Sequence, residues 1–354
     1  MMYIILAILA FGLLIVIHEL GHFAAAKAFH VKVLEFSVGM GPRLFKKQGR
    51  ETLYSLRALP IGGSCLMEGE DAETGDTRSF TAQPRWKRFI ILVAGALMNF
   101  LAGALVIFLL VSQASSFSGT TLTGLADGFP LQGEEGLLPG DTIVSINGER
   151  LYYLEDFAVF MSLAGNKPVD LVINRGGRTI QRNDFPLVLR EYTQDGETVV
   201  RYGVTFNTIE ATVGAKVKYA AYKTMNFVRL IRVSLSMLVS GSAGLKDLSG
   251  PVGIVSAINQ VGQNQSVPLS ERLANIAYFC AFIAINLAVF NLLPIPALDG
   301  GRIFFMAVTF VVEKLTRKHI DPKYEGYVHT AGFVLLMGLM LIVMFNDVVK
   351  LFNG

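Results

Sequence analysis

Cysteine and net charge are both scarce in this sequence. The 354 residues carry a formal net charge of only +3, which is too small to indicate a protein that binds nucleic acid. Only two cysteines occur, Cys65 and Cys280. One lies in a loop predicted to be cytosolic and the other in a predicted membrane span, so we expect no structural disulfide.

The N-terminal segment lacks the marks of a cleaved signal peptide. No positively charged region precedes its apolar run, and no small-x-small cleavage site ends it, so we expect a retained transmembrane helix. Apolar residues are abundant instead, since hydrophobic types make up 52% of the chain. Four segments reach the roughly 20 residues that a bilayer requires, namely residues 2–26, 89–111, 273–293 and 330–349.

The density of positive charge in the loops predicts the orientation. Residues 27–88 contain 11 Lys/Arg and 7 Asp/Glu, whereas residues 113–272 contain 14 and 15 over a much longer stretch. The first loop is therefore predicted to be cytosolic and the long loop extracytoplasmic. The basic segment 297–329 is predicted to be cytosolic as well.

The first loop is predicted to hold two short strands, at residues 31–36 and 52–59. Gly62 and Gly63 mark a turn at which the backbone can approach another chain closely. The acidic residues 68–76 are predicted to be solvated.

Residues 116–208 are predicted to form a compact β-rich module. In its signature, residues 136–148, a turn at 138–141 leads into a strand at 142–146, and Asn147-Gly148 makes a hairpin turn. A helix at 154–163 and strands at 169–174 and 179–185 follow. The run resembles a PDZ domain; the alternative is another small β module with hairpin turns. Residues 213–245 interleave basic and aromatic residues, which suits an amphipathic helix on a membrane surface or one packed against protein.

The first apolar segment contains His18-Glu19-Leu20-Gly21-His22. Histidines four residues apart lie on one face of a helix, so both imidazoles can reach one zinc ion. Glu19 can act as the general base for the water that zinc activates. A chance motif is the alternative, but ionisable residues at membrane depth are costly and rare, which favours a buried metal site.

A second motif, residues 286–302, begins late in the third predicted span. Pro294 and Pro296 interrupt the helix, and irregular backbone is tolerated at membrane depth only where it lines protein or a cavity. Asp299 is therefore predicted to be the third zinc ligand, with a helix cap as the alternative. Asn286 and Asn291 could hold a substrate backbone or a developing oxyanion. His329 is expected at the entry to the last span, without the spacing to complete the site.

Taken together, these motifs resemble the site-2 proteases, which are intramembrane zinc metalloproteases, and within them the bacterial PDZ-containing branch of the regulator-of-sigma-E type. Seven segments carry the resemblance: residues 18–27, 36–42, 60–63, 95–100, 136–148, 248–254 and 286–302.

The resemblance implies a zinc site of His18, His22 and Asp299, with Glu19 as the base. It implies that Asn286 and Asn291 contact substrate, and that the loop at Gly62 and Gly63 pairs with an unwound substrate helix by strand addition. Residues 64–66 depart from the usual family pattern, so substrate preference transfers less directly than catalysis.

The predicted fold class is thus a polytopic α-helical membrane protein with about four transmembrane helices, a membrane-associated β hairpin on the cytosolic side and an inserted extracytoplasmic PDZ domain. The predicted divisions are residues 1–112, 113–208, 209–272 and 273–354: a first membrane core, the PDZ domain, an amphipathic connector and a second membrane core.

By resemblance, the protein lies in a bacterial inner membrane, and its substrates are pre-cleaved single-pass membrane proteins of the anti-sigma-factor or remnant-signal-peptide type. The PDZ domain would bind peptide C-termini or exclude bulky substrates. A catalytically inactive membrane PDZ scaffold and a conventional zinc protease acting on soluble peptides are the competing functions.

Overall fold

The computed structural model describes residues 2–70, 74–194, 197–242, 244, 250–317 and 323–353. Two compact units make up the chain. The first, called the membrane unit below, comprises Met1–Leu110 and Lys223–Gly354. The second, the inserted unit, comprises Val111–Tyr222. Helix α4 (Val213–Val239) begins in the inserted unit and ends in the membrane unit.

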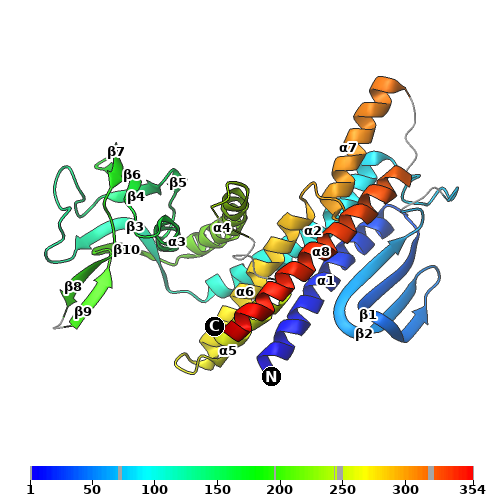
Figure 1. Ribbon diagram of the computed structural model, residues 1–354, viewed down its shortest axis with the longest axis horizontal. Helices are drawn as coiled ribbons and strands as arrows, with labels where there is room; N and C mark the ends of the chain where they lie inside the picture. The colour runs from blue at the N-terminus through cyan, green and yellow to red at the C-terminus, as the bar shows by residue number, and fades with distance from the viewer. Residues whose placement is uncertain are drawn as a thin grey trace. The chain divides into compact units, whose positions relative to one another are not determined.

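Long helices dominate the membrane unit (Figure 1). They are α1 (Met2–Ala28), α2 (Arg85–Ser112), α5 (Pro251–Gln263), α6 (Leu269–Asn291), α7 (Asp299–Thr316) and α8 (Lys323–Asn353). Within the described part of the chain, four stretches are long and apolar enough to cross a membrane: Met2–Ala28, Arg85–Ser112, Leu269–Asn291 and Tyr324–Lys350. Each overlaps a predicted span, so the prediction of a helical membrane protein with β elements is confirmed.

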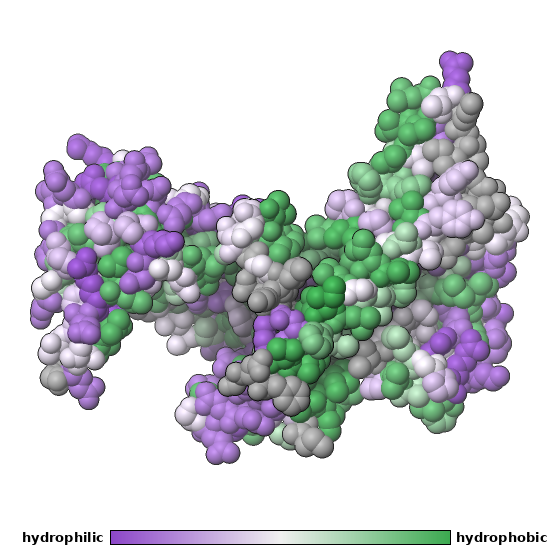
Figure 2. Space-filling model, in the orientation of Figure 1, coloured by the Kyte–Doolittle hydropathy of each residue, from purple (hydrophilic) through white to green (hydrophobic). Residues whose placement is uncertain are grey.

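The outer faces of these helices are apolar. Figure 2 shows hydrophobic side chains gathered over the helices of the membrane unit, whereas the visible surface of the inserted unit is largely polar. On α8, for example, Leu335 and Phe345 are 68% and 72% exposed. So many exposed apolar side chains on neighbouring helices indicate a surface that faces lipid. A helix is stable in lipid because its backbone hydrogen bonds are all made within the helix.

The first loop forms a bent antiparallel pair, β1 (Val33–Gln48) and β2 (Leu53–Met67). Because β2 folds back, the first half of β1 has two neighbours. On one side Val38 lies beside Gly63, with antiparallel register as far as Val33 beside Met67; on the other side Val38 lies beside Leu56. Residues 63–67 are therefore an outer edge of this sheet, and no further strand pairs with them among the described residues.

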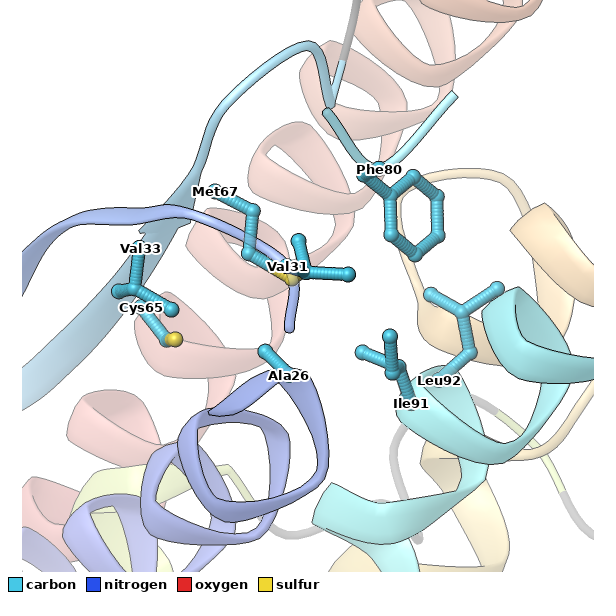
Figure 3. Close-up of a cluster of buried hydrophobic side chains, with 8 residues drawn as sticks. All are labelled: Ala26, Val31, Val33, Cys65, Met67, Phe80, Ile91 and Leu92. Carbon is cyan, nitrogen blue, oxygen red and sulfur yellow. The ribbon is translucent and has the colours of Figure 1, made fainter. Parts of the chain in front are cut away.

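A buried apolar cluster ties the sheet to the helices. Its side chains come from the end of α1, from β1 and β2, from the following loop and from α2, and Figure 3 shows them converging. The members are Ala26, Val31, Val33, Cys65, Met67, Phe80, Ile91 and Leu92. The hairpin is thus held against α1 and α2 on the side that carries the histidine motif. Cys65 and Cys280 are both free thiols.

Further contacts fix the remaining helices of this unit. The carboxylate of Asp347 on α8 accepts hydrogen bonds from the backbone N–H groups of Gly250 and Gly253, at 2.9 and 2.8 Å, and so caps the start of α5. In the second half of α4, Phe227 packs on Tyr278 and Phe282 of α6. This part of the amphipathic segment therefore packs against protein.

The inserted unit is built on a sheet of order β10-β3-β4-β6-β7, with β5 paired to β4. Its elements are β3 (Ser116–Leu125), β4 (Thr142–Ile146), β5 (Glu149–Arg150), α3 (Leu154–Ala164), β6 (Val169–Arg175), β7 (Arg178–Phe185), β8 (Arg190–Gln194), β9 (Glu197–Arg201) and β10 (Val204–Glu210). The buried carboxylate of Asp141 receives two hydrogen bonds of 2.8 Å from the Arg175 guanidinium, which secures the turn before β4. The PDZ assignment stays a prediction.

Three features differ from the sequence reading or lie outside it. Residues 299–316 form helix α7, where only a basic cytosolic segment was expected, and β8 pairs with β9 in a hairpin that was not predicted. The acidic stretch is not simply solvated, because Glu68 lies 3.2 Å from Lys32 and Glu70 lies 3.2 Å from Arg302. Residues 71–73 of that stretch, and residues 248 and 249 of the family motif, lie outside the described residues.

Candidate metal centre

Helix α1 presents the two histidines on one face. The Nε2 atoms of His18 and His22 lie 3.1 Å apart, and the two rings are nearly perpendicular, with centroids 4.7 Å apart. The four-residue spacing brings both rings to the same side, as the sequence predicted.

Asp299 lies beside the two histidines, although it is far from them in sequence. It is the first residue of α7, directly after the two-proline loop, and its Oδ2 lies 3.2 Å from His18 Nε2 and 3.3 Å from His22 Nε2. Glycines allow this helix to start so close to the loop. A Cβ on Gly300 would lie 2.3 Å from the carbonyl oxygen of Leu293, and one on Gly301 would lie 2.2 Å from that of Ile295.

The three donor atoms fit a zinc ion. Bonds of about 2.0–2.1 Å in a tetrahedron place neighbouring ligand atoms about 3.3 Å apart, and the three separations here are 3.1, 3.2 and 3.3 Å. The side chains of His18, His22 and Asp299 are only 12%, 8% and 18% exposed. Among the described residues, Asp299 Oδ2 is a buried oxygen without a hydrogen bond of good geometry. Two histidines and one carboxylate leave a fourth position open, as in catalytic zinc sites.

Helix α2 supports the site from behind. The Nδ1 atom of His22 lies 2.8 Å from the carbonyl oxygen of Ile91, so Nδ1 carries the proton and Nε2 is left free for a metal. A Cβ on Gly95 would lie 2.4 Å from His22 Nε2 and 2.8 Å from His18 Cε1. Sequence reasoning did not identify the Ile91 carbonyl, since no side-chain pattern marks a backbone acceptor.

A cavity of about 410 Å³ opens onto the three donor atoms. Glu19 and Asn291 line it, together with residues 64–67 of the β2 edge. Gly63 is next to Glu19, because a Cβ there would lie 3.3 Å from Glu19 Cγ. The structure therefore brings together the predicted ligands, Glu19, Asn291 and Gly63.

Two other predicted residues, Asn286 and Gly62, are not among the residues that line this cavity. The Oδ1 atom of Asn286 is buried, with no hydrogen-bond partner among the described residues. Gly62, with φ of 93°, lies against the Met40 side chain, where a Cβ would come within 2.5 Å. Its left-handed backbone makes the turn into the edge strand.

Charged pairs that the sequence did not reveal also line the cavity. Glu35 binds Arg57 at 2.9 Å and accepts further hydrogen bonds from Arg43 and Ser55. Burial alone would raise the pKa of Glu35, but these hydrogen bonds outweigh it and lower the pKa to about 2. Glu70 and Arg302 form the second pair. The carboxylates of Glu35 and Glu70 are thus each paired with an arginine.

Comparison with known proteins identifies the family. The profile of peptidase family M50 matches residues 6–339. The chain belongs to peptidase family M50, the site-2 proteases. Relatives from Clostridium perfringens and Clostridium acetobutylicum, both provisionally named zinc metalloproteases, are each 38% identical. They align with 98% and 99% of this chain and with 99% and 98% of their own lengths. The regulator of sigma-W protease RasP of Bacillus subtilis is 29% identical over 99% of each chain.

This site-2 protease is a zinc metalloprotease, as the sequence predicted. Its four apolar helices and its family make it an intramembrane enzyme. The family match runs through both halves of the chain and so includes the helix of His18 and the loop of Asp299.

Proposed function

We propose that this site-2 protease hydrolyses peptide bonds within transmembrane segments of single-pass membrane proteins that have already been cut on their outer side. The observation that carries the proposal is the cavity in which the triad of His18, His22 and Asp299, the carboxylate of Glu19 and an open sheet edge converge.

His18, His22 and Asp299 would hold the zinc ion. Zinc, when bound, would polarise the scissile carbonyl and make water acidic enough to lose a proton near neutral pH. Glu19 would accept that proton, because its carboxylate lies in the same cavity as the donor atoms. It would then pass the proton to the amine of the leaving peptide.

The β2 edge supports an extended substrate. A helix shields its own carbonyls by hydrogen bonding, so a transmembrane substrate must unwind before hydrolysis. Residues 63–67 form an outer edge with which no other described strand pairs, and residues 64–67 of it line the cavity. A peptide added as a strand there would place its backbone beside Glu19. Gly63 keeps this approach open, since a side chain would project toward Glu19 Cγ.

The asparagines complete the proposed substrate site. Asn291 lines the cavity and could donate from its amide nitrogen to a substrate carbonyl or to the developing oxyanion. Asn286, five residues earlier on α6, has a buried amide oxygen that could accept from a substrate N–H. Partial unwinding would expose the backbone groups that these amides need.

For location and partners, we propose a bacterial inner membrane with the inserted unit on the outer side. Loop charge supports this orientation. Substrates would be of the anti-sigma-factor or remnant-signal-peptide type, which agrees with the name of the sigma-W protease relative. The inserted unit, as a PDZ domain, would exclude substrates with bulky ectodomains or bind new C-termini.

The test is cleavage of a model single-span substrate by purified full-length protein in detergent. Wild type, Glu19→Gln and chelator-treated wild type are compared, with Glu134→Gln in the inserted unit as a matched control, because the Glu134 side chain is 89% exposed. We expect Glu19→Gln to lose about 10²–10⁴-fold in rate while keeping its zinc. Glu134→Gln should cleave like wild type.

The competing functions make different predictions in this assay. Normal turnover by Glu19→Gln would remove Glu19 from the mechanism. Preferential cleavage of a soluble peptide would indicate a conventional zinc protease. A wild-type protein that binds no zinc would indicate the inactive scaffold.

A further inference from the structure

The loop that delivers Asp299 is held from outside by the last helix. The backbone N–H of Ala297 donates a hydrogen bond of 3.0 Å to Nδ1 of His329 on α8. Ala297 lies two residues before Asp299 and 32 residues before His329 in sequence. The hydrogen bond therefore joins α8 directly to the segment that sets where α7 and its first residue begin.

The loop has an unfavourable backbone at this point. Ala297 has φ of 77°, in the left-handed region that a residue with a Cβ rarely adopts. The prolines at 294 and 296 have no N–H with which to hold the segment. The N–H groups of Ile295 and Leu298 bond within the loop, to the carbonyls of Leu293 and Ile295. Ala297 instead donates across to another helix, so its strained conformation is stabilised by His329.

A second contact lies one turn further along α8. A Cβ on Gly332 would lie 2.2 Å from Pro296 Cβ and 2.9 Å from the Pro296 carbonyl carbon. Residues three apart lie on the same helix face. His329 and Gly332 therefore meet consecutive residues of the loop, Ala297 and Pro296, and the hydrogen bond is made where the two backbones approach closely.

Side-chain packing does not fill this side of the loop. A second cavity, of about 470 Å³, lies there and is lined by Tyr327, His329, Thr330 and Phe333 of α8. Ala297 and Arg302 line both this cavity and the metal cavity. The loop at Ala297 therefore lies between two cavities. Because few packed side chains hold it there, a single hydrogen bond affects its position more than it would in a close-packed core.

We propose that His329 is a positioning residue for the zinc site. By accepting the Ala297 hydrogen bond it holds the left-handed turn, and the turn sets the start of α7 so that Asp299 Oδ2 lies within reach of both histidines. The proposal rests on the proposed zinc site of His18, His22 and Asp299. His329 is not among the described residues that line the metal cavity.

The test compares His329→Ala, His329→Asn and Thr330→Ala in the full-length protein. Thr330 is the matched control, because it lines the same cavity and its hydroxyl donates a hydrogen bond within α8, to the carbonyl of Gly326. Zinc affinity is measured by competition with a chelator. The visible absorption of the Co²⁺-substituted protein reports ligand geometry independently of activity.

We expect His329→Ala to bind zinc about 10- to 100-fold more weakly, as supporting residues of metal ligands typically do, and to alter the Co²⁺ spectrum. His329→Asn should recover most of the affinity, because its amide oxygen can accept the same N–H. Thr330→Ala should match wild type. A wild-type affinity and Co²⁺ spectrum in His329→Ala would overturn the proposal.

Three further outcomes separate the possible failures. If His329→Ala does not fold, Gly332→Ala tests the same contact, because its methyl group must push α8 away from Pro296; unchanged zinc affinity there would also overturn the proposal. If wild type binds no zinc, the proposed function itself fails. Equal loss in the alanine and asparagine variants would show that the ring's packing matters and that the hydrogen bond does not.

Discussion

Replacing Gly95 by alanine should damage the zinc site without touching a ligand. The new Cβ would lie 2.4 Å from His22 Nε2 and 2.8 Å from His18 Cε1. Carbon and nitrogen atoms in contact prefer about 3.5 Å, so the overlap with His22 is about 1 Å. Zinc–ligand distances tolerate only about 0.2 Å. Both rings must therefore move further than a bound zinc allows.

The size of the effect follows from what holds His22. Its ring cannot swing away without losing the 2.8 Å hydrogen bond to the Ile91 carbonyl, which contributes about 0.5–1.5 kcal/mol. Overpacking adds about 1–3 kcal/mol. Without zinc the rings can relax, so this cost falls on zinc binding. A total of about 1.5–4.5 kcal/mol corresponds to zinc affinity weakened about 10- to 2,000-fold.

The assay is chelator competition on purified Gly95→Ala, with two controls on glycines in other environments. Gly103→Ala is on the same helix, and its Cβ would lie 2.9 Å from the Ala281 carbonyl oxygen of α6, away from the histidines. It should lower unfolding stability and leave zinc affinity unchanged. Gly338→Ala has open space around it and should be neutral.

Wild-type zinc affinity in Gly95→Ala would refute the reasoning, because it would mean that α2 does not press against the histidines. An equal loss of zinc affinity in Gly103→Ala would also refute it. That result would mean that any displacement of α2 weakens zinc binding, without a direct clash with the histidines.

Three other outcomes follow from buried charge. Glu35→Gln should destabilise the β1–β2 hairpin by about 3 kcal/mol, since it leaves Arg57 without its anion; amide hydrogen exchange in β1 measures this. Folding lowers the Glu35 pKa from 4.5 to about 2, so the contribution of Glu35 to the free energy of unfolding should be complete above pH 4.5 and lost as pH falls toward 2. A free energy of unfolding that does not change between pH 4.5 and pH 2 would contradict this. Asp141→Asn should weaken the inserted unit by about 3 kcal/mol in urea unfolding, and adding Arg175→Met should cost little more; additive losses would argue against the pair.

Much of the architecture was predictable because the signals are local. A run of about 20 apolar residues predicts a membrane span regardless of what the helix packs against. The four candidate membrane helices overlap the four spans predicted from the sequence. The spacing of His18 and His22 places both on one helix face. Strands and turns of the inserted unit were marked by alternation and by Asn-Gly and Gly-Gly pairs. Helix α7 was not predicted, because the basic residues of this segment, Arg302 and Lys314 among them, were used only to place it on the cytosolic side.

Contacts across the chain were not predictable in the same way. His329 has no useful spacing to the metal motifs in sequence, yet α8 places its Nδ1 against Ala297. The acceptor for His22 is the carbonyl of Ile91, which any residue type would supply. Glu70 reads as part of a solvated acidic run, but folding pairs it with Arg302.

The sequence by itself determined the membrane-spanning helices, the paired histidines with their neighbouring glutamate, and the identity of a carboxylate that could join them. These depend on hydropathy and helical periodicity, which are properties of short segments. Only the tertiary structure decided that Asp299 lies within 3.3 Å of both histidines, that the β2 edge faces Glu19, and that α2 and α8 support the site. Such contacts depend on how distant helices pack, and helix packing is set by the summed fit of many side chains.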